Sequence, residues 1–152
     1  MPRVHRQIVV PTVTRALPHD PGGQISGLYV QAMSIVFGAQ FLRPADPSNA
    51  RYVGAVERAM GLMEDTRDCW LWRNDLDSAG RASAALSAFA FELDRVGDAL
   101  RWMARAHKEL GPEHEEQVAH NFLFILLHVQ EEYDKALQQA ALQAWRGARA
   151  SK

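Results

Sequence analysis

Apolar residues recur along most of the chain with the period of an α-helix. Between residues 24 and 42 they lie three and four positions apart, a spacing that places them on one helical face. This face carries Leu28, Ala32, Ile35, Val36 and Ala39. The segment RPADPSN follows, and it supplies both a stop and a new N-cap at Ser48 or Asn49. The pattern therefore predicts a first helix over 24–42.

The same period predicts a second helix over 50–66. Its apolar face carries Tyr52, Val56, Ala59, Met60 and Met63. The segment RDCWLWRND follows as a short aromatic link, and we expect its tryptophans in or over the core. Because Cys69 lies among these aromatic residues, we expect a buried and chemically inert thiol.

Two further helices precede the C-terminal region. Asp77 or Ser78 caps the first of them, AGRASAALSAFAFELDRV, whose small residues allow neighbouring helices to approach closely. The second runs from Asp98 to Leu110, is amphipathic, and stops at Gly111-Pro112. The loops between all these helices are short, which is typical of antiparallel neighbours.

The C-terminal region predicts two more helices, over about 113–130 and 133–149, with EEYDK between them. The apolar run 122–129, FLFILLHV, is too short to span a bilayer, which needs about 20 apolar residues. A helix that is apolar on all sides is covered by neighbours, so we expect this run to be the central buried helix of a bundle. The side chains of Phe122, Phe124, Leu126 and Val129 should be largely buried, opposite Phe89, Leu93, Leu100 and Met103.

The first 23 residues do not follow the helical pattern. IVVPTVT is rich in β-branched residues and is split by Pro11, which favours an extended arm or an edge strand. The turn residues PHDPGG close this segment. We therefore predict an all-α fold: a single-domain bundle of about six helices over 24–150, with an extended N-terminal arm and turn over 1–23. The arm is expected to pack on the helical body or on a neighbouring subunit.

Composition narrows the function classes. The 152 residues are the size of one domain. The net charge of −1 argues against a protein that coats nucleic acid through a large overall positive charge. Residues 1–60 carry six basic against three acidic groups, whereas residues 61–152 carry eleven against fifteen, so charge is polarised along the chain. A single cysteine forms no internal disulfide. Because we find neither a signal peptide nor a membrane span, we expect a cytoplasmic location.

The sequence contains no complete motif for metal binding or catalysis. HEEQVAH differs from the zinc-protease motif HExxH because the position four beyond His114 is Val118. His128 shares a helical face with Glu131 or Glu132, but a di-iron bundle needs a second such pair and two further carboxylates. There is also no nucleophile motif and no phosphate-binding glycine loop. We therefore expect a protein that is not an enzyme and that takes no metal or cofactor.

Two stretches resemble the tetratricopeptide repeat, a helical hairpin of about 34 residues. One runs from Leu86 to Pro112 and the other surrounds EEYDKAL, so that Ala99 corresponds to Ala136, 37 residues later. No glycine lies in the EEY turn, and residues 24–66 give no third copy, although about three repeats are needed for stability. The resemblance implies an adaptor or chaperone that holds a peptide or protein partner in a concave groove.

The size, the helix count and the arginine-bearing helices resemble the small helical subunit of multi-subunit CRISPR effector complexes, which serve antiviral defence. The resemblance implies a subunit that lines a filament of backbone subunits and helps to hold crRNA and its target. Arginine suits contacts to phosphate groups, which give binding without sequence preference. The candidate nucleic-acid-binding residues are Arg51, Arg58, Arg101, Arg105, Arg146 and Arg149.

Together these features lead us to expect a non-enzymatic helical subunit of a multi-subunit ribonucleoprotein. One complex could contain multiple copies of this subunit. Its partners are other protein subunits and an RNA or RNA–DNA backbone. Because the net charge is near zero, we expect nucleic acid to bind only within the assembled complex. The alternative is a tetratricopeptide-like adaptor or chaperone that binds a peptide or protein.

Overall fold

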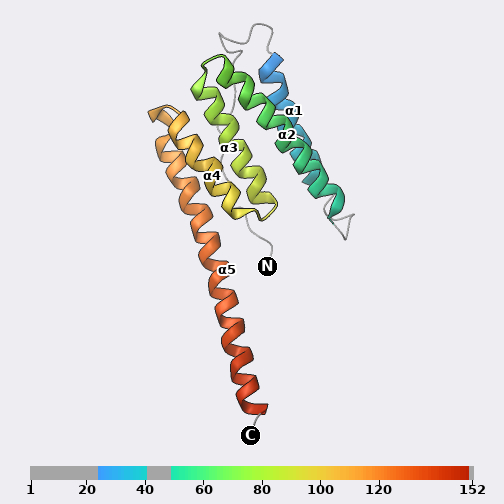
Figure 1. The fold of residues 1–152 in the computed structure, drawn as a ribbon, viewed down its shortest axis with the longest axis vertical. Helices are drawn as coiled ribbons and strands as arrows, with labels where there is room; N and C mark the ends of the chain where they lie inside the picture. Colours follow the sequence, from blue (N-terminus) through green and yellow to red (C-terminus); the bar gives the residue numbers. More distant parts are fainter. Residues whose placement is uncertain (1–23, 41–48, 151–152) are drawn as a thin grey trace.

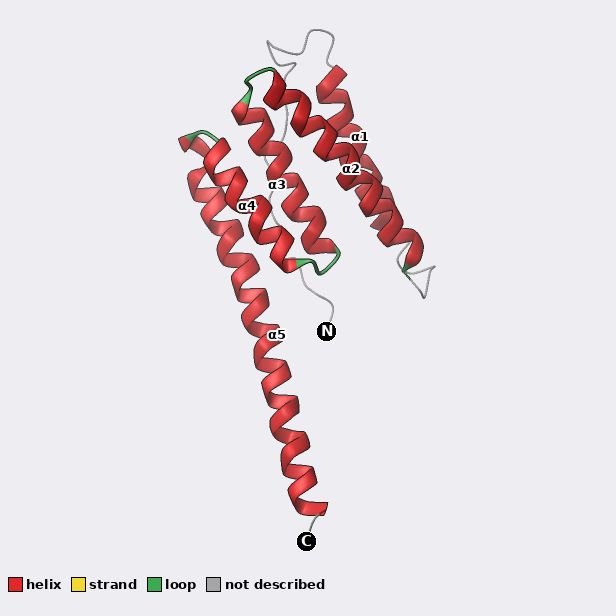
Figure 2. Cartoon of the chain, in the orientation of Figure 1, coloured by secondary structure: helices red, strands yellow, loops and turns green. Residues whose placement is uncertain are grey.

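The computed structural model describes residues 24–40 and 49–150, and every element in these ranges is helical, which confirms the all-α fold. Figure 2 shows the described helices without any strand among them. The elements in chain order are α1 (Gln24–Gln40), α2 (Ala50–Trp72), α3 (Leu76–Glu92), α4 (Val96–Glu109), the 3-10 turn η2 (Pro112–His114) and α5 (Glu115–Ala150). The expected arm over 1–23 and residues 41–48, which include all of the RPADPSN linker except Asn49, lie outside the described residues.

Successive helices pack on one another in the order of the chain, with α3 between the α1–α2 pair and the α4–α5 pair (Figure 1). Two clusters of buried side chains result. The first joins α1, α2 and α3 around Trp70, Tyr52 and Phe89. The second joins α3, α4 and α5 around Met103 and Ile125. Since α3 contributes to both clusters, it is the central helix of the fold.

The central position of α3 follows from its small side chains. Eleven of its seventeen residues are buried, and most of these are alanine or serine. Small residues let helices approach from two sides, and Gly80 marks the closest approach, since a Cβ atom there would lie 2.9 Å from the backbone nitrogen of Leu110. The expectation that the run 122–129 forms the central buried helix was therefore wrong, because close packing on two sides requires small side chains more than bulky ones.

Two turns of the same design connect α2 to α3 and α3 to α4. Each contains one residue with a left-handed backbone, Asn74 with φ 59° and Asp94 with φ 58°. Asn and Asp adopt this conformation more readily than other non-glycine residues. The following amide closes each turn by donating to the carbonyl oxygen five positions earlier, at 2.9 Å in both: Asp75 to Trp70 and Arg95 to Ala90. This is the hydrogen-bond pattern of a helix C-terminus that ends in a Schellman motif.

The C-terminal region departs from the expected hairpin. We predicted two helices separated by EEYDK, but α5 continues without a break from Glu115 to Ala150. Its 36 residues give a length of about 54 Å at 1.5 Å per residue, and it extends far beyond the other helices (Figure 1). The position equivalent to Asp94 is Glu131, 37 residues later, and glutamate does not favour the left-handed backbone that a turn requires. The helix therefore continues through EEYDK.

The predicted apolar faces of the first two helices are confirmed, whereas the expectations for the aromatic link are not. Ala32, Val36 and Ala39 of α1 are buried, as are most of the residues assigned to the face of α2. However, α2 continues through the link as far as Trp72. Trp70 is fully buried, but Trp72 is 87% exposed, and Cys69 is exposed where we expected a buried thiol. A continuous helix places these residues on different faces, since successive residues are 100° apart.

The N-cap of α3 differs from the expected one, whereas the N-cap of α2 is one of the two expected. The side chain of Asp75, and not that of Asp77 or Ser78, caps α3 by accepting a hydrogen bond from the Ser78 amide at 3.1 Å. Asn49 occupies the N-cap position of α2, as expected, although its side chain makes no capping hydrogen bond. The sequence analysis thus placed the start of α3 about one turn too late.

A network of polar side chains ties α2, α3 and α4 together. Arg67 donates to Glu109 at 2.9 Å and to Ser83 at 2.8 Å, and the Ser83 hydroxyl donates to Glu109 at 2.7 Å. The side chains of Arg67 and Glu109 are only 15% and 9% exposed. Because each charge has its partner, the network avoids the cost of an unpaired buried ion and holds the three helices in one arrangement.

Within the residues that the structure describes, no helix combines the length and the apolar character that crossing a bilayer requires. This agrees with the interpretation of the run 122–129 as too short.

Candidate functional site

The first half of α5 is attached to the body through one narrow face. Val118, Asn121 and Ile125 are buried there, three and four residues apart. The contact ends at His128, whose ring lies edge-on to Phe91 of α3 with 5.0 Å between the ring centroids. From Val129 to Ala148 every side chain is exposed. The described part of the chain therefore leaves the side chains of about half of α5 uncovered.

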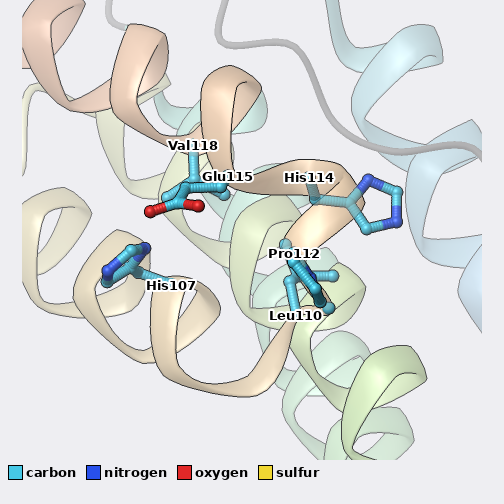
Figure 3. Close-up of a pocket in the computed structure, with 7 residues that line it drawn as sticks. His107, Leu110, Pro112, His114, Glu115 and Val118 are labelled. Atoms are coloured by element: carbon cyan, nitrogen blue, oxygen red, sulfur yellow. The ribbon is translucent and has the colours of Figure 1, made fainter.

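A groove runs between α4 and the first half of α5. Its apolar part has a volume of about 380 Å³ and is lined by His107, Glu115, Ala119, Phe122, Leu123 and Leu126. A second hollow of about 260 Å³ continues it toward the α4–α5 connection and is lined by His107, Leu110, Gly111, Pro112, His114, Glu115 and Val118. In Figure 3, His107 of α4 and Glu115 of α5 face one another across this second hollow, while the ring of His114 points away from both. The groove thus has an apolar floor and a polar end.

An apolar stripe continues from this groove along most of α5. We define it as Ala119, Leu123, Leu126, Tyr133, Leu137, Ala140 and Ala144, with Gln130 between its two halves. All these side chains are exposed, including Leu123 at 55%, Leu126 at 51%, Tyr133 at 66% and Leu137 at 57%. Their spacing alternates between four and three residues, which is the spacing of a seam between two paired helices. The stripe lies on a different face from Val118, Asn121 and Ile125, which pack on the body.

The two candidate arginines of α4 are engaged by neighbours in the same helix. Arg101 pairs with Asp98, one turn earlier. The guanidinium of Arg105 lies over the ring of Trp102 at 4.7 Å from its centroid, and Arg67 of α2 lies over the same ring at 5.4 Å. Both candidates are exposed, and exposed contacts of this kind are weak, so both arginines remain accessible to a ligand.

The remaining candidate arginines lie on α2 and α5. Arg51 and Arg58 are exposed on one face of α2, two turns apart. Arg146 is exposed near the end of α5, and the side chain of Arg149 lies outside the described ones. The candidates are therefore distributed over three helices and are not gathered into one basic site.

One cluster that sequence reasoning did not single out lies near the α4–α5 connection. Possible ligand atoms of Asp77, Glu113 and His114 lie within 4.8 Å of one another. However, Asp77 already forms an ion pair with Arg81 at 3.0 Å and accepts a hydrogen bond from the Gly111 amide at 3.2 Å. A cation in this cluster would have to compete with the guanidinium, so its residues are better explained as a link that fixes the end of α4 against α3.

The apolar stripe is the main surface feature that the sequence analysis missed. We had assigned the apolar residues on either side of EEYDK to the cores of two separate helices. The alternating spacing from Ala119 to Ala144 is present in the sequence and would have revealed one continuous stripe if no turn had been assumed. What the groove and the stripe offer chemically is a surface for binding another helix.

Comparisons of the chain with protein-family models, with curated proteins and with solved structures find no match.

Proposed function

We propose that this protein is a non-enzymatic assembly subunit that binds an amphipathic α-helix of a protein partner in the groove between α4 and α5. The observation that carries the proposal is the groove with its apolar floor of Phe122, Leu123 and Leu126. Amphipathic helices bind to grooves of this kind through apolar residues spaced three and four positions apart. The polar end formed by His107 and Glu115 fixes where such a helix begins or ends along the groove.

The body of the protein suits this role. The Arg67–Ser83–Glu109 network and the two Schellman turns hold α2, α3 and α4 in a fixed arrangement. A groove whose walls are already in place binds at a lower entropic cost than one that must first be ordered.

Photo-crosslinking from inside the groove tests the proposal. A photoreactive phenylalanine analogue at Leu123 should crosslink, in cells that produce the protein, to a segment with apolar residues at three- and four-residue spacing. The same analogue at Phe37, which is 63% exposed on α1, provides the matched control. Mass spectrometry of the crosslinked peptides identifies the segment. Equal crosslinking from both positions, or none from Leu123, would contradict a binding function for the groove.

A contact with nucleic-acid backbone is the second candidate, and the position of Arg51 and Arg58 on one exposed face of α2 favours it. Such a face can follow a phosphate backbone without reading its sequence. Within this proposal the protein is a subunit of a ribonucleoprotein, similar to the small subunit of CRISPR effector complexes. The two candidates use different surfaces, α2 for nucleic acid and the α4–α5 groove for protein, so single substitutions separate them.

A further inference from the structure

We propose that the helix bound in the α4–α5 groove is the second half of α5 from another copy of this chain, in an antiparallel dimer. This inference rests on the proposed function, because it names the partner of the same groove. In the dimer, residues 133–148 of each copy lie along residues 115–130 of the other.

The first observation is that the two halves of α5 carry the apolar pattern of the α3–α4 hairpin, although α5 does not fold back on itself. With the 37-residue offset, Leu123, Leu126 and Leu127 correspond to Leu86, Phe89 and Ala90, which are buried in α3. Tyr133, Leu137 and Ala140 correspond to Val96, Leu100 and Met103, which pack into the second core cluster. The first half therefore resembles α3 and the second half resembles α4, but each leaves exposed the residues that α3 and α4 bury.

The second observation is that the chain cannot bring the two halves together without breaking the helix. The turns that close the other hairpins contain Asn74 or Asp94 in a left-handed conformation. Glu131 occupies the equivalent position, and α5 remains straight there. A segment that cannot reach its own partner surface can reach the same surface on a second copy, which is the principle of domain swapping.

The third observation is that the residues of the apolar stripe meet in matching layers when two copies run in opposite directions. Each half carries two bulky residues, Leu123 and Leu126 in the first half and Tyr133 and Leu137 in the second, together with alanines at 119, 140 and 144. Antiparallel pairing places Leu123 opposite Ala140, Leu126 opposite Leu137, Tyr133 opposite Gln130 and Ala119 opposite Ala144. Leu123 then meets the smaller Ala140, and Tyr133 meets Gln130 instead of a second Tyr133. In-register parallel pairing would place every residue against its own copy, with Leu123 against Leu123 and Ala140 against Ala140, so that large residues meet only large ones and small residues only small ones.

The groove also continues an interface that already exists. Glu115 and Ala119 line it from α5 and His107 lines it from α4, so a helix placed there extends the α4–α5 contact by one further antiparallel neighbour. The second copy would complete, for α5, the two-sided cover that α3 already has. Because the dimer is two-fold symmetric, the same contact forms twice and the full length of both α5 helices is used.

The association test uses the full chain and two matched leucine substitutions. Light scattering after size-exclusion chromatography should give a dimer mass that falls to the monomer mass on dilution. Leu137→Lys should weaken dimerisation by roughly 100-fold, since symmetry places the charge in two apolar layers and each costs about a factor of ten or more. Leu142→Lys is the control, because Leu142 is also exposed but points away from the stripe. Circular dichroism checks that both variants remain folded.

The direction of pairing is tested by disulfide formation in a Cys69→Ser background, which removes the exposed native thiol. Chains with Ala119→Cys and chains with Ala144→Cys should form a mixed disulfide with each other, and neither should form a disulfide with itself. Disulfides require Cβ atoms about 4 Å apart, so this pattern is specific to the antiparallel arrangement. A self-disulfide at either position instead of the mixed one overturns the proposed geometry.

The inference and the proposed function can fail separately. A chain that stays monomeric at the highest concentration, or a dimer that Leu137→Lys does not weaken, excludes the second copy as the occupant. If Leu123 then still crosslinks to a helix of a different protein, the groove binds helices but not its own. If Leu123 crosslinks to nothing, both the inference and the proposed function fail.

Discussion

The α3–α4 hairpin and the α5 helix have related patterns of apolar residues but adopt different structures. In the hairpin, Asp94 takes a left-handed backbone, the chain reverses, and the apolar faces of the two helices cover each other. In α5, Glu131 keeps the helical backbone and the corresponding faces stay exposed. The comparison leads to the hypothesis that one turn residue decides whether the apolar faces cover each other within the chain or stay exposed.

The largest expected difference concerns two equivalent apolar residues, Phe89 and Leu126. Phe89 is 2% exposed in the core, so Phe89→Ala should lower the free energy of unfolding by about 3–5 kcal/mol. Leu126 is 51% exposed, so Leu126→Ala should change it by less than about 1 kcal/mol when measured on dilute, monomeric protein. Urea unfolding followed by circular dichroism gives both values. Similar losses for the two variants would mean that the Leu126 face is covered within one chain.

The second comparison concerns Gly80 and its equivalent in α5, Gln117. A Cβ atom at Gly80 would lie 2.7 Å from the Leu110 side chain and 2.9 Å from its backbone nitrogen. Gly80→Ala should therefore destabilise the protein by about 1–3 kcal/mol, although alanine is the better helix former. Gln117→Ala should stay within about 0.5 kcal/mol, because it is a partly exposed helical position. A neutral or stabilising Gly80→Ala would place α3 further from the end of α4 than the structure does.

A substitution at position 131 tests whether the turn residue determines if α5 folds back into a hairpin or stays straight. Glu131→Gly combined with Glu132→Asp supplies a residue that tolerates the left-handed backbone and an N-cap for a following helix. We expect residues 133–148 to fold back on residues 115–130, which shortens the molecule. Small-angle scattering should show a smaller maximum dimension, and dimerisation should be lost because each chain covers its own groove. Glu131→Ala is the control and should keep α5 straight, since alanine favours the helix by about 1 kcal/mol over glycine.

The smallest effects are expected for the arginines. Because the pair between Arg101 and Asp98 is exposed, Arg101→Ala should alter stability by no more than about 0.5 kcal/mol. The same limit applies to Arg51 and Arg58, which are exposed. In an assembled complex, each arginine that contacts phosphate should lower the slope of log affinity against log salt by about one when replaced by alanine. Unchanged slopes for Arg51 and Arg58 would exclude the nucleic-acid candidate on α2.

The sequence predicted helices well where the buried residues of a helix form one regularly spaced face. Tyr52, Val56, Ala59 and Met63 were assigned to the buried face of α2 from spacing alone, and all four are buried. The stop at Gly111-Pro112 was also correct, because glycine and proline end helices for local steric reasons. In both cases the information lies within a few residues of the position concerned.

The predictions that were wrong concern features that tertiary packing determines. The run FLFILLHV was taken for the centre of the bundle because it is the most apolar segment, yet Leu126 and Val129 are exposed, Phe122 and Phe124 are half-buried, and only Ile125 within the run is fully buried. Total apolar content does not tell whether a helix is covered by its own chain or by a partner. Likewise EEYDK was interpreted as the connection between two helices, although it lacks a residue such as Asn74 or Asp94 that adopts the left-handed backbone of the other turns. The candidate groove could not be foreseen, since it depends on which face of α5 meets α4.

The straight second half of α5 has a consequence for the dynamics of the chain. Every side chain from Val129 to Ala148 is exposed among the residues that the structure describes, and helices of about this length have little stability in water without tertiary contacts. Residues 133–148 should therefore open and exchange their amide hydrogens with solvent far faster than α3, whose opening requires most of the core to unfold. Any partner that covers the stripe slows this exchange. The time course of deuterium uptake in α5 is thus a direct record of how much of the protein is bound at a given moment.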